Sequence, residues 1–394
     1  MFSVTGRGAS GSNENAQIGE DEEMGLKPMN CPGHCLLFKS QKRSYKDLPI
    51  RYADFGALHR NEVSGSLSGL TRVRRFHQDD GHVFCRPSQI TEEIQKTLEF
   101  VAVVYKTFGL GPYKMVLSTR PEEFIGNVEE WDRAESQLKM ALDATGKPWT
   151  VNDGDGAFYG PKIDIILTDN DGKEHQTATI QLDFQLPQRF ELGYVSPAPG
   201  LEAQGRLDEA TQEQLDEPGL VTPVIIHRAV LGSLERFMAL IIEHYNGTYP
   251  FWISPRQCII LAVNQDPQLA QDIKHAVDLI SLGQNAQTPE TNNGSTTRAL
   301  SPLDYQIQLD TDLSARPLGK KIREARKAGY AMVAVMGPED ARSETVVLEL
   351  ANVRDKEKIK DVFGEDGLRW DGEKTRVGFR ELREGCRRLE RRFW

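Results

Sequence analysis

The 394-residue chain lacks the features that mark membrane proteins, small secreted proteins and generally basic proteins. It contains no run of 18 apolar residues, which excludes a predicted membrane-spanning helix. Its five cysteines are too few for a secreted disulfide framework, so we expect a reducing compartment. With 48 Lys and Arg against 58 Asp and Glu, the formal net charge is −10, so any nucleic-acid contact must come from a local basic patch. The length predicts two or three globular domains.

Several short motifs are also missing. No GxxxxGK followed by Ser or Thr occurs, so a nucleotide site here would not be a P-loop, and the absence of HExxH disfavours a zinc protease. Residues 1–23 hold no apolar stretch typical of a signal peptide, and the acidic run at 20–23 disfavours a mitochondrial presequence. We interpret residues 1–26 as a polar tail or a remnant loop.

The pattern of apolar residues predicts a first domain over residues 27–252. Its expected helices cover 91–107, with Ser88 as a possible cap, and 232–245, and its expected strands cover 71–84, 114–118, 163–168, 176–184 and 224–227. The hairpin signal at 169–172 favours an antiparallel sheet. The Pro/Gly-rich, acidic stretch 195–221 predicts an insertion loop.

A second domain is predicted over residues 257–394, after a linker bracketed by Pro250 and Pro255. Helices expected at 267–280 and 318–327 alternate with strands expected at 258–263, 331–336 and, as an edge strand, 346–350, a pattern typical of an α/β domain with a largely parallel sheet. Residues 284–301 predict a loop. The C-terminal residues predict a helix that packs on this sheet through an apolar stripe of Phe379, Leu382, Cys386, Leu389 and Phe393. Seven arginines face this stripe, and a basic side that contacts RNA is an alternative that can coexist with the packing.

Two polar strand faces indicate a functional surface in the first domain. Gln78, Asp80 and His82 share one face of a regular strand, and Thr179 and Gln181 share a face with Asp183 on another. Burying such groups unpaired is costly, so they line either a wet surface or a polar cleft.

A metal site and an anion site are further candidates. Cys31, His34 and Cys35 form a local knuckle, but no second such motif follows, so a closed structural zinc site is incomplete. A catalytic zinc needs three protein ligands, which distant strands can supply. Arg60 and Arg236 suit phosphate oxygens because guanidinium groups bind two oxygens at once, although either could be an ordinary salt-bridging residue.

Taken together, these stretches resemble the threonyl-tRNA synthetases, which are class II aminoacyl-tRNA synthetases. The matching segments, in chain order, are Lys27–His34, Arg51–Gly56, His59–Glu62, Ser64–Arg74, Gln78–His82, Leu117–Pro121, Gly156–Lys162, Gln181–Phe184, Ile226–Ala229 and Arg236–Phe237. The resemblance implies an α+β fold: an antiparallel class II sheet flanked by helices, followed by an α/β anticodon-binding domain. It implies activation of threonine with ATP and transfer to tRNA(Thr).

The resemblance also implies a zinc centre. Cys31, His82 and His227 match the three zinc ligands of the family, which leaves His34 and Cys35 as structural bystanders. Threonine would fill the open zinc positions with its amino and hydroxyl groups. A metal that demands a hydroxyl ligand separates threonine from isosteric valine.

The remaining family positions bind the two substrates. Those implied for threonine are Gln78, Asp80, Tyr159 and Gln181, with Asp80 accepting the hydroxyl proton. Arg60 and Arg236 match the catalytic arginines of motifs 2 and 3, which hold the phosphates of ATP. Further ATP positions are Arg72, Gln176, Thr179 and Ser233, and Mg2+ should accompany ATP.

The sequence also departs from the family pattern. We find no motif 1, the family's dimer element, so we expect an N-terminally truncated sequence of a protein that is a homodimer at full length. The acidic insert at 195–221 and the polar loop suggest a mitochondrial matrix enzyme; a cytoplasmic one is the alternative. The competing hypotheses are a catalytically inactive paralogue that binds zinc, nucleotide or tRNA in a regulatory role, and a zinc hydrolase.

Overall fold

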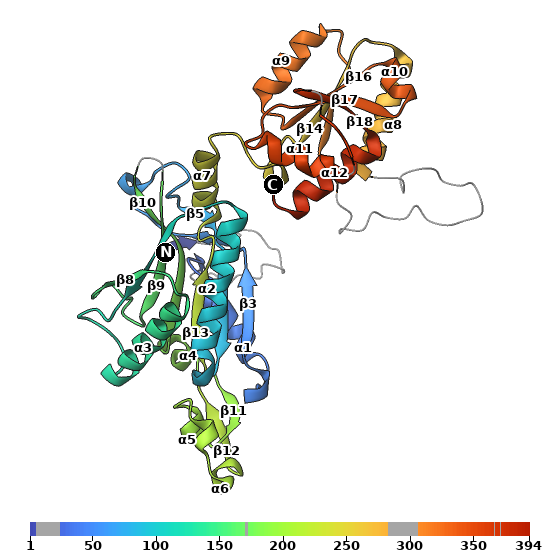
Figure 1. Cartoon of the computed structure of the whole chain (residues 1–394). Coiled ribbons are helices and arrows are strands. Elements are labelled where there is room, and N and C mark those ends of the chain that lie inside the picture. The colour runs from blue at the N-terminus through green and yellow to red at the C-terminus, as the bar shows by residue number, and fades with distance from the viewer. Residues whose placement is uncertain (5–23, 170–171, 283–305, 366, 371) are drawn as a thin grey trace, which may run out of the picture. The chain divides into compact units, whose positions relative to one another are not determined.

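The computed structural model describes the chain except residues 5–23, 170–171, 283–305, 366 and 371, and it divides into two compact units (Figure 1). The first unit covers Met1–His244 and the second Tyr245–Trp394. Within the described residues, no helix combines the length and apolar character needed to cross a bilayer.

A seven-stranded sheet forms the centre of the first unit. In spatial order its strands are β3 (Ile50–Asp54), β6 (Asp80–Cys85), β13 (Val224–Ala229), β10 (Glu174–Asp183), β9 (Lys162–Thr168), β7 (Tyr113–Ser118) and β8 (Trp149–Asn152). Every neighbouring pair is antiparallel except β7 and β8, which run parallel. The predicted antiparallel sheet is therefore confirmed.

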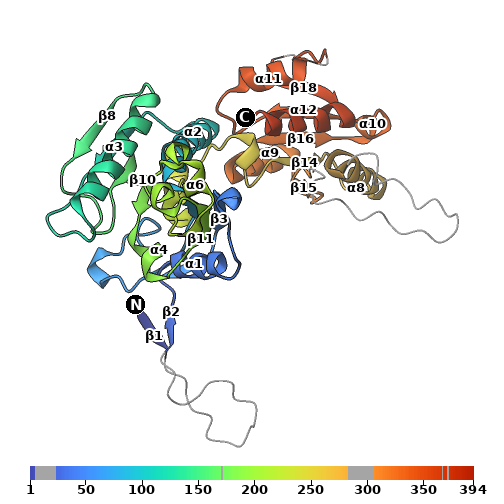
Figure 2. The same ribbon diagram turned by 90° about the horizontal axis from the view of Figure 1, so that it is seen from below.

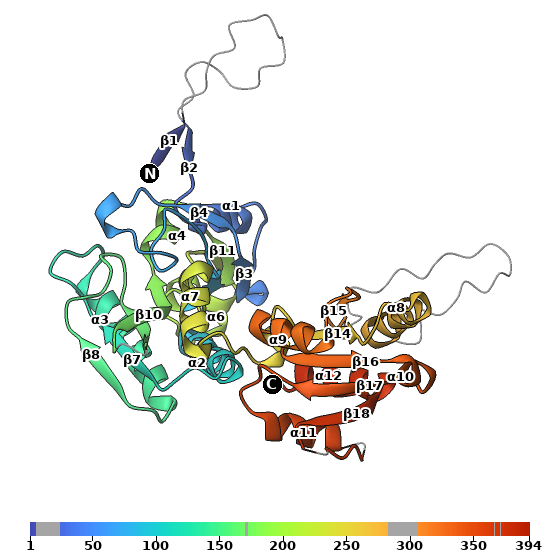
Figure 3. The same cartoon turned by 90° about the horizontal axis from the view of Figure 1, so that it is seen from above.

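Helices cover the two faces of this sheet. α2 (Ile90–Thr107) and α3 (Val128–Ala144) pack on one face, where Val83 of β6 and Ile226 of β13 join the larger core. α1 (Cys31–Lys39) packs on the other face (Figure 3). It does so through Phe38, which stacks on Phe84. Because strand side chains alternate between faces, Asp80, His82 and Phe84 share the face of α1.

Two expectations about local structure were wrong. Residues 71–84 do not form one strand, because β5 (Arg75–His77) ends before β6 begins and pairs instead with β4 (Ala57–His59). Ser88 does not cap α2, since the N-cap is Gln89 and its side chain makes no capping hydrogen bond. The bounds of α2 agree with the predicted helix within one residue. Residues 170 and 171 of the predicted hairpin lie outside the described residues.

The stretch predicted as an insertion loop is a folded subdomain. Its strands β11 (Tyr194–Pro197) and β12 (Pro218–Val221) pair, and they enclose two short helices, α5 (Pro199–Glu202) and α6 (Gln212–Leu215). Fully buried Glu202 accepts a hydrogen bond from Tyr194 at 2.7 Å and two from Arg86. A buried carboxylate needs such partners, so this network anchors the subdomain to the end of β6.

The second unit is built on a mixed five-stranded sheet (Figure 2). Its order is β15 (Leu309–Asp312), β14 (Cys258–Ala262), β16 (Met332–Met336), β17 (Thr345–Leu350) and β18 (Lys374–Gly378). The first three strands run parallel, whereas β17 pairs antiparallel with both β16 and β18. β17 is therefore an interior strand and not the predicted edge strand, because β18, which was not predicted, pairs with its outer side.

Helices on both faces complete this unit. α9 (Leu318–Ala328) packs on one face, and α8 (Pro267–Leu282), α11 (Lys356–Gly364) and α12 (Phe379–Arg391) pack on the other. α12 buries four residues of its predicted stripe, while Phe393 lies beyond the helix and is half exposed. The helix therefore packs on its domain as predicted. The loop expected at 284–301 lies outside the described residues.

Candidate functional site

A row of polar and aromatic side chains crosses the first sheet on the face of α1. Tyr52, His82, His227, Gln181 and Lys162 are successive cross-strand partners on β3, β6, β13, β10 and β9. Directly paired residues project from the same face of a sheet. Three of the five, His82, His227 and Gln181, are residues that the resemblance singled out, and the row defines the floor of the candidate site.

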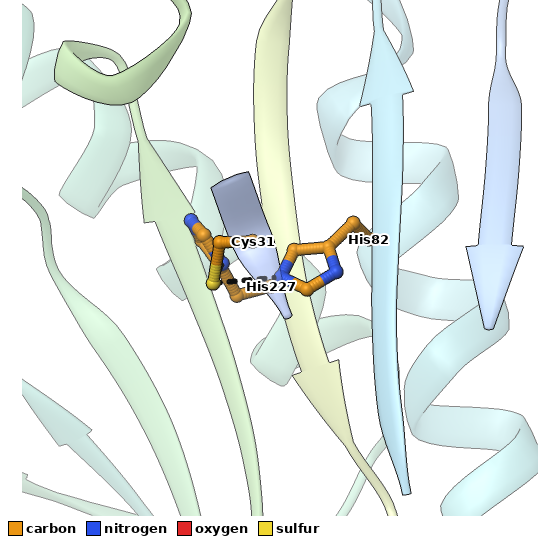
Figure 4. A group of neighbouring side chains, drawn as sticks. All are labelled: Cys31, His82 and His227. Carbon is orange, nitrogen blue, oxygen red and sulfur yellow. Dashed lines mark hydrogen bonds between the residues drawn. The ribbon is translucent and has the colours of Figure 1, made fainter. Parts of the chain in front are cut away.

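The start of α1 brings a cysteine onto this row. The sulfur of Cys31 lies 3.1 Å from Nε2 of His82 and 3.5 Å from Nδ1 of His227 (Figure 4). The three ligand atoms lie within 4.8 Å of one another. Ligands of a tetrahedral zinc ion at its usual bond lengths are separated by about 3.5 Å. One thiol and two imidazoles form a donor set that suits zinc and leaves one position of a tetrahedron open.

The charges around the three side chains also fit a cation. Burial and the neighbouring His227 lower the pKa of His82 to about 2, so its ring is neutral, the form that ligates metals. Burial and the negative charge of Asp80 raise the pKa of Cys31 to about 12. Without a metal the thiol of Cys31 therefore keeps its proton. A divalent cation reverses this preference for the protonated form, because a coordinating thiol loses its proton.

The other half of the predicted knuckle does not join the cluster. Cys35 is fully buried and packs with Phe38 and Phe84, and burial raises the pKa of its thiol to about 12. His34 contacts the cluster without belonging to it, because its Nδ1 lies 2.7 Å from Nδ1 of His82. The local spacing of the motif gave no sign of this contact.

Candidate threonine-binding residues surround the cluster. Asp80 is buried, its Oδ1 lies 3.8 Å from Nε2 of His82, and its Oδ2 accepts a hydrogen bond from Asn30 at 3.1 Å. Burial raises the pKa of Asp80. The Tyr159 hydroxyl donates to Oε1 of Gln181 at 3.0 Å, and burial raises the pKa of that hydroxyl to about 12.

Gln78 does not lie on the strand that was predicted to carry it. It falls between β5 and β6, where it forms an isolated bridge with Ser233. The next residue, Asp79, is buried and its Oδ2 accepts hydrogen bonds from the backbone of Val230 and Leu231. This contact fixes the turn that leads into α7 (Leu234–Tyr245), and the sequence analysis did not identify it.

Three arginines gather near the start of α7. Arg236 donates through Nε to the carbonyl of Thr71 at 3.0 Å, and burial together with the positive charges of Arg72 and Arg60 lowers its pKa. Arg60 lies over the ring of Phe76 at 5.1 Å. Arg72 is paired with Glu62 at 2.8 Å, but the repulsion that lowers the pKa of Arg236 shows that positive charge is concentrated here, and such charge favours a polyanion such as a triphosphate.

Two further predicted ATP residues, Gln176 and Thr179, lie on β10 and form a hydrogen-bonded group with Asp164 of β9. Gln176 donates through Nε2 to Oδ1 of Asp164 and to the hydroxyl of Thr179, each at 2.6 Å. Thr179 also donates to Oδ1 of Asp164 at 2.9 Å. Asp164 was missed from the sequence, although its cross-strand pairing with Thr179 places it on the same face. Its carboxylate orients two of the predicted residues.

Comparisons with known families agree with this architecture. Residues 15–245 match the model described as "tRNA synthetase class II core domain (G, H, P, S and T)". Residues 257–362 match the model described as "Anticodon binding domain". The two matches fall on the antiparallel and the mixed sheet respectively.

Similar curated proteins carry the name of one activity. A protein of Schizosaccharomyces pombe, named "Probable threonine--tRNA ligase, mitochondrial", is 46% identical over 353 residues, which cover 88% of this chain and 70% of that protein. "Threonine--tRNA ligase, mitochondrial 1" of Arabidopsis thaliana is 47% identical over 83% of this chain. "Threonine--tRNA ligase, cytoplasmic" of Saccharomyces cerevisiae is 44% identical over 86%. The chain spans 40% of the length of each of these last two proteins.

Solved structures show the same likeness. The structure titled as the RNA binding domain of threonyl-tRNA synthetase from Cryptosporidium parvum Iowa II superposes with a TM-score of 0.74 at 42% identity, over 94% of this chain and 78% of that one. A threonyl-tRNA synthetase from Aeropyrum pernix gives a TM-score of 0.65 at 28% identity, over 94% and 75% of the two chains. The chain therefore belongs to the threonyl-tRNA synthetase family of class II aminoacyl-tRNA synthetases.

Proposed function

We propose that this chain is a threonine–tRNA ligase that activates threonine with ATP to threonyl-adenylate and transfers the threonyl group to tRNA(Thr). One observation carries the proposal: the cluster of Cys31, His82 and His227 lies on the same sheet face as the groups around Asp164 and Gln181, in a chain of this family. The site thus combines a metal-binding donor set with anion-binding arginines.

Cys31, His82 and His227 would hold zinc. A zinc ion there supplies an open coordination position that the threonine hydroxyl fills and that valine leaves unmet. Asp80, whose Oδ1 lies 3.8 Å from Nε2 of His82, would accept the hydrogen of the substrate hydroxyl. Tyr159, Gln181 and Gln78 would orient the rest of the amino acid, with the Tyr159–Gln181 hydrogen bond keeping both side chains in place.

Arg60 and Arg236 would hold the phosphates of ATP with its Mg2+. Adenylate formation is an in-line displacement at the α-phosphate, in which the enzyme positions the reactants and stabilises charge. Arg60 would bind the α-phosphate and the attacking carboxylate, and Arg236 the triphosphate. Arg72, Gln176, Thr179 and Ser233 would complete the nucleotide site, with Asp164 fixing two of these side chains.

The second unit would bind the tRNA, as its match to an anticodon-binding domain supports. The relatives include both mitochondrial and cytoplasmic proteins, and we propose the mitochondrial matrix for this one, with a homodimer as the full-length assembly.

Charging of tRNA(Thr) tests the proposal. The zinc-loaded chain is incubated with ATP, labelled threonine and a tRNA(Thr) transcript, and acid-stable label on the tRNA is counted. We expect threonylation that depends on zinc and is lost in His82→Ala, which also loses the metal. A folded, zinc-loaded chain that binds ATP but charges no tRNA would favour the inactive paralogue instead.

A further inference from the structure

The two histidines of the metal cluster present different ring nitrogens to Cys31. His82 faces the sulfur with Nε2, at 3.1 Å, whereas His227 faces it with Nδ1, at 3.5 Å. A neutral imidazole carries one hydrogen, so a ring that ligates through one nitrogen must carry its hydrogen on the other. The partner of that other nitrogen therefore decides whether the ligating lone pair is available.

Asp183 is the partner of His227. Its Oδ2 lies 2.8 Å from Nε2 of His227, and its side chain is nearly fully buried. Its Oδ1 accepts hydrogen bonds from the backbone N–H groups of Gln185 at 2.8 Å and Leu186 at 2.9 Å, at the start of α4 (Gln185–Arg189). The carboxylate is thus held from two sides, and it accepts the hydrogen of Nε2 and leaves the lone pair of Nδ1 facing Cys31.

His34 is the partner of His82. It lies three residues after Cys31, on the same side of helix α1, and its Nδ1 is 2.7 Å from Nδ1 of His82. One of these two nitrogens must donate and the other accept. If His82 offers Nε2 to a metal, its hydrogen is on Nδ1, so His34 must accept through Nδ1. One helix therefore supplies both a candidate ligand and the group that orients a second one.

We propose that Asp183 and His34 are the positioning residues of this metal site, and that they select Nδ1 of His227 and Nε2 of His82 as ligating atoms. The inference rests on the proposed zinc site and adds to it the residues that set its geometry. A carboxylate or a similar acceptor behind a ligating histidine fixes the ring and raises its basicity.

The affinity for zinc, measured without substrate by competition with a chromophoric chelator, tests this role. Asp183→Ala and His34→Ala should each weaken zinc binding about 10- to 100-fold. His34→Asn keeps an acceptor near the place of Nδ1 and should recover most of the lost affinity. Asp183→Asn should not, because the backbone N–H groups of Gln185 and Leu186 hold its single oxygen and its NH2 group then faces Nε2 of His227 as a donor. Co2+ in place of zinc should show an altered visible spectrum in the two alanine variants, because the ligand geometry changes.

The chain offers a matched control. Asp169 lies 2.7 Å from Nε2 of His175 in the same unit, also largely buried, but outside the metal cluster. Asp169→Ala removes a comparable carboxylate–histidine contact and should leave zinc affinity unchanged. Circular dichroism confirms that each variant is folded before its affinity is compared.

Nitrogen-15 NMR of the zinc-loaded wild-type protein gives a second measurement that needs no variant. We expect the hydrogen on Nδ1 of His82 and on Nε2 of His227. The opposite tautomers, or folded alanine variants with wild-type zinc affinity, would overturn the inference while the zinc site itself stands. A wild-type chain that binds no zinc would instead overturn the proposed metal site, and the inference with it.

Discussion

At the scale of single residues, Arg60 offers a test of the proposed nucleotide site that is independent of the metal site. Its guanidinium group is exposed above Phe76, and no atom of it belongs to the Cys31 cluster. A loss of Arg60 should therefore change the reaction with ATP and leave the metal in place.

Arg60→Ala should lower the rate of threonyl-adenylate formation by about 100-fold or more, because one preorganised charge donor at a reacting phosphate is worth this much. Zinc content should stay at the wild-type level. Arg74→Ala is the matched control, since the Arg74 side chain bonds to the backbone of Glu62 and to Ser64. A near-normal exchange rate in Arg60→Ala would refute the assigned role.

At the scale of secondary-structure elements, close contacts between strands position the site. Gly160 lies between Tyr159 and the edge of β9, and a Cβ atom at this position would come within 1.8 Å of the carbonyl oxygen of Leu182 on β10. Only a glycine fits here without moving the backbone, so the loop that carries Tyr159 depends on it.

Gly160→Ala should shift this loop and weaken threonine binding, with a loss of stability of about 1–3 kcal/mol as for other overpacked sites. Equilibrium dialysis with labelled threonine and thermal unfolding measure the two effects. Gly200→Ala in α5 is the control, because no atom lies within 4 Å of its added carbon. Unchanged binding and melting temperature in Gly160→Ala would show that the loop tolerates the change.

An ion pair ties the edge strand β3 to helix α2. Arg51 donates two hydrogen bonds of 2.7 Å to Glu93, whose carboxylate is buried while Arg51 is half exposed. Burial alone would raise the pKa of Glu93, but the bonds from Arg51 and Lys96 outweigh it and lower that pKa. The pair therefore contributes stability above the unfolded-state pKa of Glu93 and loses it as the pH falls through the lower, folded-state value.

Glu93→Gln should accordingly destabilise the protein at neutral pH, by about 1–2 kcal/mol for a half-exposed charged pair. The difference from wild type should shrink as the pH falls below about 4.5, where Glu93 of the unfolded wild-type chain takes up a proton. Urea unfolding at several pH values measures this. A difference that is constant with pH would contradict the ionic account.

Local sequence patterns predicted many of the helices and strands, but not the long-range contacts that arrange them. The alternation of Thr179, Gln181 and Asp183 correctly placed all three on one face, because period-two alternation is a property of the strand itself. The folded subdomain at 194–221 was missed because its composition is that of a loop, and the buried contact of Glu202 with Arg86 spans 116 residues. The contacts of His34 with His82 and of Asp183 with His227 were not predicted for the same reason, because a local sequence pattern does not indicate which distant side chain a residue contacts.

At the scale of the whole molecule, the candidate metal ligands all belong to the first unit. A ligand that binds only the folded state stabilises a protein by about 4 kcal/mol when its concentration is 1,000 times its Kd. Removal of zinc should therefore raise amide hydrogen exchange in peptides from α1, β6 and β13, and leave β14 and β16 nearly unchanged. Mass spectrometry of the exchanged chain measures this, and equal increases in both units would contradict a site confined to the first.

The central claim is that the chain activates threonine. ATP–pyrophosphate exchange by the zinc-loaded chain, with threonine, serine and valine in parallel, tests it most directly. The account predicts exchange with threonine, rejection of valine because it leaves the metal position unmet, and weaker discrimination against serine, which has the hydroxyl. Exchange that is as fast with valine as with threonine, or absent with all three in a folded and zinc-loaded chain, would contradict it.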